Sequence, residues 1–155
     1  MKDFRFKPLV ALILIMCCTL GYAQRFEIDG LKYKVVDESK RYVEVVDGPN
    51  TKTVKIPTTI TRGGVKYTVK SIGKKAFEDC YNLTSITIPS SVTNIGEMAF
   101  RYCSNLTSIT IPRSVTSIED WAFLGCESLT SITLPKHIKN VHNLYNRQPK
   151  NRGAK

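Results

Sequence analysis

The strongest constraint on this chain is a 23-residue segment that occurs three times in succession. The copies read IGKKAFEDCYNLTSITIPSSVTN (residues 72–94), IGEMAFRYCSNLTSITIPRSVTS (residues 95–117) and IEDWAFLGCESLTSITLPKHIKN (residues 118–140). The first two copies are identical at 16 of 23 positions. A fixed period of this length is typical of solenoids, in which each copy forms one coil and buries its apolar side chains against the next coil.

Each copy contains a short extended segment. In the first copy, Ile86 and Ile88 flank Thr87, so a strand here would point its isoleucines inward and its hydroxyl outward. Pro89 follows, and a proline cannot donate a hydrogen bond to a neighbouring strand. We expect a short strand that ends at this proline, and a second extended piece that turns Val92 and Ile95 inward.

The rest of each copy has a different pattern. Ala76, Phe77 and Cys80 have the spacing of side chains on one side of a helical turn. We therefore predict a mainly β solenoid in which short strands alternate with helical turns. Equivalent residues of successive coils should form continuous columns, such as Phe77, Phe100 and Phe123.

These copies closely resemble the BspA-like branch of the leucine-rich repeats, which has the form I-G-x-x-A-F-x-x-C-x-x-L-x-x-I-x-I-P-x-x-V. The resemblance is specific over residues 72–141 and extends more weakly back to Phe26. It implies a right-handed solenoid with one strand per coil on a shared sheet. It also implies export and a role in adhesion or protein binding.

Residues 24–71 precede the clear repeats and have a β pattern. Alternating apolar residues on both sides of Asp29-Gly30 predict a hairpin. A strand over residues 42–46 should be followed by a turn at Asp47-Gly48, and residues 54–57 look like the end of a degenerate first coil. A second small hairpin is expected around Gly63-Gly64. We expect the whole segment to form an N-terminal β cap over the sheet edge.

The first 23 residues have the pattern of a signal peptide. Lys2, Arg5 and Lys7 precede twelve apolar residues, LVALILIMCCTL, and then Gly21-Tyr22-Ala23. Twelve helical residues rise only about 18 Å, which is too short to cross a bilayer. We expect cleavage after Ala23, export to the cell surface or the medium, and no transmembrane span in the mature chain. Lipid attachment at Cys17 or Cys18 is an alternative, although no small residue precedes either cysteine.

The net charge of +10 is concentrated at the two ends of the chain. Six cations and no acids lie between Lys136 and Lys155. We interpret residues 142–155 as a disordered basic tail, because the repeat pattern is lost at Tyr145 and Asn146. A basic end of this kind does not by itself predict nucleic-acid binding, and we expect none.

The sequence contains no recognisable catalytic or metal-binding motif. His137 and His142 have no partner at ligand spacing, and the recurring Cys80, Cys103 and Cys126 are expected to be buried free thiols. The acidic residues Asp79, Glu97, Glu119 and Asp120 are interpreted as solvated turn residues, and Asn82 and Asn105 as asparagines that bond to backbone in turns. The sequence thus predicts no enzyme, no cofactor and no metal site.

A partner protein would most simply be bound where outward positions line up from coil to coil. The strand face offers the column Thr87, Thr110 and Thr133, which could equally be solvent-facing filler. Positions that differ between copies include Lys75, Met98 and Trp121 in one column, with Arg101 and Tyr102 nearby. The candidate partner-binding residues are therefore Trp121, Tyr102, Arg101, Met98, Thr87, Thr110 and Thr133.

The predicted function is that of an exported protein-binding or adhesin-like module whose partner is an extracellular or surface protein. A structural envelope component, or a truncated fragment of a longer repeat protein that binds nothing, is the alternative. Trp121 has an alternative interpretation of its own, because its ring could simply cover the last coil.

Overall fold

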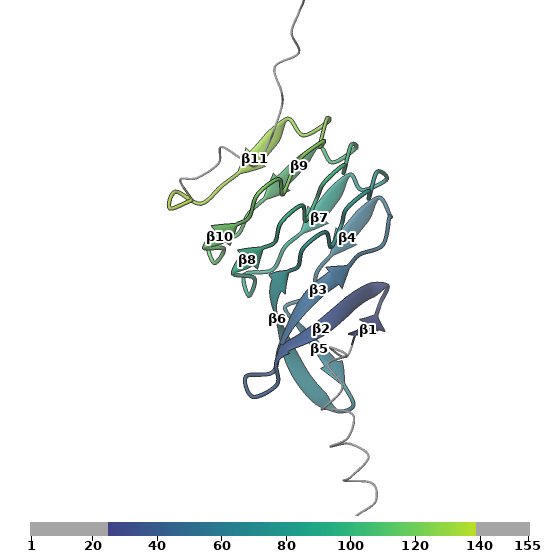
Figure 1. The fold of residues 1–155 in the computed structure, drawn as a ribbon, viewed down its shortest axis with the longest axis vertical. Helices are drawn as coiled ribbons and strands as arrows, with labels where there is room; N and C mark the ends of the chain where they lie inside the picture. The colour runs from purple at the N-terminus through teal and green to yellow at the C-terminus, as the bar shows by residue number, and fades with distance from the viewer. Residues whose placement is uncertain (1–24, 139–155) are drawn as a thin grey trace, which may run out of the picture.

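A computed structural model describes residues 25–138, which form a stack of coils built almost entirely from short strands (Figure 1). The first six strands belong to the N-terminal part: β1 (Arg25–Ile28), β2 (Leu31–Asp37), β3 (Tyr42–Asp47), β4 (Thr53–Lys55), β5 (Thr59–Arg62) and β6 (Val65–Ile72). The repeats contribute β7 (Ser85–Thr87), β8 (Asn94–Ile95), β9 (Ser108–Thr110), β10 (Ser117–Ile118) and β11 (Ser131–Thr133).

The coils are joined by parallel strand pairing along two lines. The first line runs β3, β6, β8, β10 and aligns Val45, Ile72, Ile95 and Ile118 in one column. The second line contains the pairs β4–β7 and β9–β11, so that four coils each contribute one strand (Figure 1). The solenoid predicted from the 23-residue period is confirmed.

Two predicted hairpins are also confirmed. Asp29 and Gly30 connect β1 to β2 with φ angles of 52° and 77°, and the strands pair antiparallel. Gly63 and Gly64 connect β5 to β6 with φ angles of 54° and 78°. Positive φ at both turn residues matches the twist of the flanking strands, and glycine adopts it without strain. The capping role of β1 and β2 stays a prediction.

In the repeats, the core consists of columns of equivalent and mostly identical side chains. The rings of Phe77 and Phe100 stack at 5.3 Å between centroids, and those of Phe100 and Phe123 at 5.4 Å. The side chains predicted to point inward are buried, including those of Ile86, Ile88, Val92, Ile95, Leu83, Leu106, Ala76, Ala99 and Ala122. In the last described coil Ile132 and Leu134 are only partly buried.

The helical turns expected between the strands are not formed, and no helix occurs between residues 25 and 138. Residues 74–79 form consecutive reverse turns instead. The N–H groups of Lys75, Phe77 and Asp79 donate to carbonyl oxygens of the next coil, at 2.7–3.0 Å. Because these donors point along the stack axis, they cannot form the i to i−4 bonds of a helix. The prediction that Ala76, Phe77 and Cys80 are buried together still holds.

The turn predicted at Asp47-Gly48 is also absent, because the backbone there bonds to the next coil instead of reversing direction. The N–H of Gly48 donates to the carbonyl oxygen of Ala76 at 2.8 Å. A Cβ atom on Gly48 would lie 1.9 Å from Cε1 of Phe77, so the close packing of this ring requires glycine. The degenerate first coil therefore begins with β3.

Some predicted features lie outside the described residues. These are the signal peptide at 1–23, His142 and the basic tail at 142–155. Within residues 25–138, no helix is long and apolar enough to cross a membrane.

Candidate functional site

Each of the three repeat copies holds two residues in the left-handed region of backbone space. The first turn column consists of Lys75, Met98 and Trp121, with φ angles of 61°, 57° and 56°. The second turn column consists of Asp79, Tyr102 and Gly125, with φ angles of 60°, 59° and 75°. Only one of the six is glycine, although the left-handed conformation costs any other L-residue about 1–2 kcal/mol.

Backbone hydrogen bonds between coils hold both columns in place. The N–H of Lys75 donates to the carbonyl oxygen of Glu97 at 3.0 Å, and that of Met98 donates to Asp120 at 3.1 Å. In the second turn column, the N–H of Tyr102 donates to Leu124 at 2.7 Å. Each coil thus fixes the turn of the coil before it, so the side chains are presented at regular intervals along the stack.

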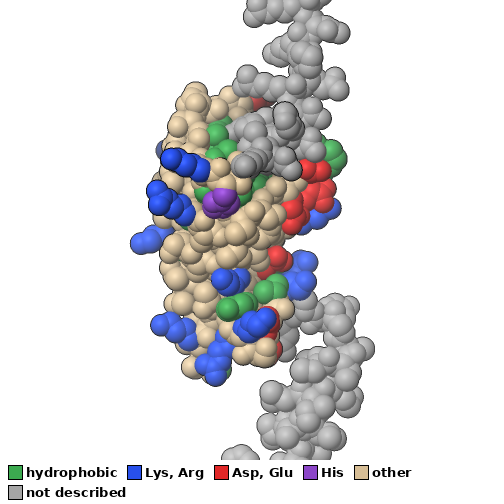
Figure 2. Space-filling view, turned by 90° about the vertical axis from the view of Figure 1, so that its left-hand side faces the viewer, with side chains coloured by type: hydrophobic (Ala, Val, Ile, Leu, Met, Phe, Trp, Pro, Cys, Tyr) green, Lys and Arg blue, Asp and Glu red, His purple; other side chains and the backbone are tan. Residues whose placement is uncertain are grey.

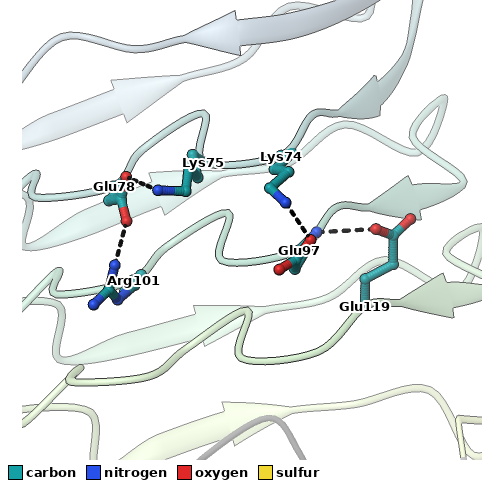
Figure 3. Close-up of polar contacts among 6 residues, drawn as sticks. All are labelled: Lys74, Lys75, Glu78, Glu97, Arg101 and Glu119. Carbon is teal, nitrogen blue, oxygen red and sulfur yellow. Dashed lines mark hydrogen bonds and ion pairs between the residues drawn. The ribbon is translucent and has the colours of Figure 1, made fainter.

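Arg101 and Tyr102 form one side-chain cluster with Glu78. Nη1 of Arg101 donates to the Glu78 carboxylate at 2.8 Å, and Nη2 donates to the Tyr102 hydroxyl at 3.1 Å. The guanidinium also lies over the Tyr102 ring, 4.4 Å from its centroid. The Nζ atom of Lys75 lies 3.0 Å from the same Glu78 carboxylate (Figure 3).

The charge on Glu78 is stabilised by these contacts. Partial burial alone would raise the pKa of the Glu78 carboxyl. The hydrogen bonds from Lys75 and Arg101 outweigh that effect, so the pKa lies below its usual value. Arg101 shares the Glu78 carboxylate with Lys75, and its Nε is buried without a hydrogen-bond partner among the described residues. Its main effect is to hold the Tyr102 ring, which remains 44% exposed.

Trp121 lines a shallow depression of about 370 Å³ together with Glu97, Glu119 and Asp120. The Glu119 carboxylate accepts the N–H of Glu97 at 3.1 Å, and Lys74 pairs with Glu97 at 2.6 Å (Figure 3). The sequence predicted these acids only as solvated turn residues. The sequence analysis did not group these acids with Trp121. The repeat spacing could have shown the grouping, because Glu97 and Asp120 are one repeat apart and therefore lie on neighbouring coils.

The threonine column lies on a different segment of the coil. Thr87, Thr110 and Thr133 are exposed on β7, β9 and β11. A second threonine column, Thr84, Thr107 and Thr130, directly precedes these strands and has a structural role. Thr107 Oγ1 donates to the Thr84 carbonyl, and Thr130 Oγ1 donates to the Thr107 carbonyl. The seven predicted residues therefore divide into a turn set (Met98, Arg101, Tyr102, Trp121) and a strand set (Thr87, Thr110, Thr133).

The cysteine column is part of the core, as predicted. Cys80, Cys103 and Cys126 are buried and free. The thiol of Cys103 lies 3.1 Å from the carbonyl oxygen of Phe77, and that of Cys126 lies 3.0 Å from Phe100. The neighbouring Cys126 thiol and burial both raise the pKa of Cys103, and burial raises that of Cys80 to about 11. Cys80 and Cys103 are therefore protonated at neutral pH and are poor nucleophiles.

Asn105 and His137 also bond between coils. Asn105 Nδ2 donates to the Tyr81 carbonyl at 2.7 Å, which confirms the structural role expected for the repeated asparagine. Nε2 of His137 lies 2.7 Å from the Val115 carbonyl, just as Ser114 Oγ bonds to Val92 at 2.7 Å. The His137 side chain is exposed, and in this column it takes the place of a serine.

Comparison with known proteins identifies the repeat. The BspA type leucine rich repeat region (6 copies) matches residues 50–147. None of the curated protein sequences compared with the chain matches it.

Solved structures of bacterial repeat proteins resemble the chain. A leucine-rich repeat protein of Bacteroides capillosus ATCC 29799 is 27% identical, with a TM-score of 0.71 over 79% of this chain and 92% of that one. A leucine rich cell surface protein of Faecalibacterium prausnitzii A2-165 is 30% identical, with a TM-score of 0.60 over 70% of this chain but only 30% of that one. The T. pallidum leucine rich repeat protein is 26% identical, with a TM-score of 0.62 over 72% of this chain and 50% of that one.

The repeat match covers well over half of the sequence, and the coils have the architecture of these solved structures. The chain therefore belongs to the family of proteins with BspA type leucine-rich repeats.

Proposed function

We propose that this chain is an exported protein-binding module whose contact site is formed by the two turn columns. The observation that carries the proposal is the presence of large side chains at left-handed positions. Glycine would relieve the backbone strain at Lys75, Met98, Asp79, Tyr102 and Trp121. These strained positions nevertheless hold large side chains, which differ from coil to coil. Strained backbone positions of this kind cluster at functional sites.

The residue types favour a protein partner. Tyr102 and Trp121 are aromatic, and residues of this type dominate the energy of protein interfaces. The Tyr102 ring is already held by Arg101 before any partner arrives. A side chain that is fixed in advance loses little conformational entropy on binding. The carboxylates beside Trp121 would favour a basic group on the partner.

The best test replaces each aromatic residue by glycine rather than alanine. Glycine removes the side chain and keeps the left-handed backbone accessible, so binding and folding effects are separated. Binding of the exported chain to a panel of purified extracellular and cell-surface proteins would be measured by surface plasmon resonance. We expect Trp121→Gly and Tyr102→Gly to weaken binding about tenfold or more, with an unchanged melting temperature.

Lys75→Gly is the matched control for the backbone change. It lies in the first turn column but removes no aromatic ring, so it should weaken binding less than either aromatic variant. Binding by all three variants that is as strong as that of the unaltered chain would exclude the turn columns as the site. A fall in melting temperature for Trp121→Gly alone, with no change in binding, would mean that the Trp121 ring only covers the last coil.

Export rests on the sequence of the first 23 residues and on the family. The Faecalibacterium prausnitzii relative is described as a cell surface protein. Intact-mass measurement of the exported chain should give a mature protein that begins at Gln24. A species that retains Cys17 or Cys18 with an added lipid would instead make this an anchored protein.

A further inference from the structure

The strands that carry the second line of pairing present a face without a single carboxylate. This strand face comprises residues 52–58, 84–90, 107–113 and 130–136, which occupy equivalent positions in four coils. Its charged residues are Lys52, Lys55, Arg113 and Lys136, and all four are exposed. The acids of residues 72–138 lie elsewhere, in the turn segments: Glu78, Asp79, Glu97, Glu119, Asp120 and Glu127.

The separation of charge extends around the coil. Residues 91–96 and 114–118, which follow the strand face, also contain no acid, and neither do residues 59–71 of the β5–β6 hairpin. Figure 2 shows the result on one side of the molecule, where the left margin carries only basic charged side chains and an acidic group lies on the right.

The charged groups of the strand face differ from those of the turns in their pairing. None of the four strand-face cations forms an ion pair with a carboxylate between residues 25 and 138. In contrast, Lys74, Lys75 and Arg101 in the turns are each paired with a glutamate. Unpaired cations that lie on one face create a positive potential, which attracts an anionic chain.

Between these cations lie rows of exposed hydroxyl groups. Lys55 pairs with Thr87 in the parallel ladder, so the row that begins with Lys55 continues as Thr87, Thr110 and Thr133. Thr53 similarly begins the row of Ser85, Ser108 and Ser131. Adjacent strands are about 4.8 Å apart, so the rows extend about 14 Å from the first to the fourth coil.

We propose that the strand face binds a sulfated glycan. Sulfate groups would pair with Lys55, Arg113 and Lys136, and the sugar hydroxyls would bond to the serine and threonine rows. The face lacks the aromatic side chains on which nucleic-acid bases stack. It also lacks an exposed apolar anchor of the kind that protein interfaces and membranes use. Flat rows of hydroxyls with scattered cations suit a flexible chain that is rich in both hydroxyls and anions.

This site is separate from the turn columns, so it goes beyond the proposed protein-binding role and can be tested independently. Affinity of the full chain for a heparin octasaccharide would be measured by titration calorimetry at low and at high salt. The double variant Lys55→Ser with Arg113→Ser should lower the affinity about tenfold. It should also reduce the salt dependence, since fewer counterions are released.

Lys74→Ser with Lys75→Ser is the matched control, because it removes the same charge from the turn side. The affinity of this control should stay near that of the unaltered chain. An equal loss in both double variants would overturn the proposal, because it would show attraction to net charge alone. Melting temperatures of both variants establish that each remains folded.

A second comparison separates the classes of polyanion. A DNA duplex and a poly-glutamate peptide of matched charge should bind more weakly than the octasaccharide, and only the octasaccharide should discriminate between the two double variants. Tighter or equally face-dependent binding of the duplex or the peptide would contradict a glycan site. No measurable binding of the octasaccharide at low salt would exclude it directly.

Discussion

The ring of Tyr102 lies directly against the α-carbon of Gly125 in the next coil. A Cβ atom on Gly125 would be 2.2 Å from Cδ1 of Tyr102, far inside van der Waals contact. Gly125 also has a φ angle of 75°, in the left-handed region. Two independent constraints therefore require glycine here: the backbone conformation and the ring of the preceding coil.

These two constraints can be separated by mutation. Gly125→Ala should destabilise the protein by about 2–4 kcal/mol, of which the left-handed backbone accounts for about 1–2 kcal/mol. In a Tyr102→Gly background only the backbone cost should remain. Urea denaturation of the four proteins in this cycle measures the coupling. Additive losses would show that the ring moves aside at no cost.

The stacked phenylalanines give a second prediction. Phe100 lies between two parallel rings and is fully buried. Phe26 is only partly buried, with Tyr33 stacked on it at 5.8 Å and the Arg62 guanidinium over its ring at 4.5 Å. Phe100→Ala should cost about 3–5 kcal/mol of unfolding free energy. Phe26→Ala should cost clearly less, since it leaves no enclosed cavity. Comparable losses in a denaturation experiment would mean that the stack does not dominate the core.

The three thiols should resist modification until the protein unfolds. Burial and the raised pKa values of Cys80 and Cys103 keep them protonated and inaccessible. Alkylation followed by mass spectrometry should add no label to these cysteines in native protein and one label to each after denaturation. Labelling of any one of them in native protein would show that its coil opens.

Cys103→Ser should be well tolerated. A buried hydroxyl that lacks a hydrogen-bond partner costs about 1–3 kcal/mol. The structure provides an acceptor, because the Phe77 carbonyl lies 3.1 Å from the Cys103 sulfur. We therefore expect a loss of only about 1 kcal/mol. A loss of about 3 kcal/mol would mean that the serine hydroxyl does not reach this carbonyl.

Asp37 should contribute an acid-dependent part of the stability. Its carboxylate accepts the N–H of Lys40 at 2.9 Å and the hydroxyl of Ser39 at 2.7 Å, which lower its pKa to about 2. An aspartate in the unfolded chain has a pKa of about 3.9. The contribution is therefore present above about pH 4 and is lost as the pH falls towards about 2.

The test compares urea midpoints of the unaltered chain and Asp37→Asn across that pH range. The difference between the two proteins should shrink as the pH falls, and Ser39→Ala should show an intermediate dependence. A difference that does not change with pH would mean that the turn at Asp37 is held by contacts other than its charge.

The parts of the fold that repeat were predictable, because each inward side chain was seen three times. Burial of the phenylalanine, cysteine and isoleucine columns followed directly from the period. The conformation of the turns was not predictable, because the usual sign of positive φ is glycine or asparagine. Lys75, Met98, Tyr102 and Trp121 give no such sign, and only Gly125 hints at it.

The N-terminal coil was only partly predictable for a similar reason. The β5–β6 hairpin interrupts the 23-residue spacing, so the alignment of Val45 with Ile72 was not visible in the sequence. The candidate site shows the same limit. The variable positions pointed to Tyr102 and Trp121. The pairing of Arg101 with Glu78 and the position of the acids beside Trp121 became evident only in the three-dimensional structure.

Between the repeat copies, equivalent bonds between coils recur every 23 residues, as Thr107 to Thr84 and Thr130 to Thr107 illustrate. A stretch of one period can therefore be gained or lost at any starting point, and the flanking coils meet the same surface as before. The length of the solenoid can therefore change during evolution by insertion or deletion of whole repeats, without disturbing the packing of the core.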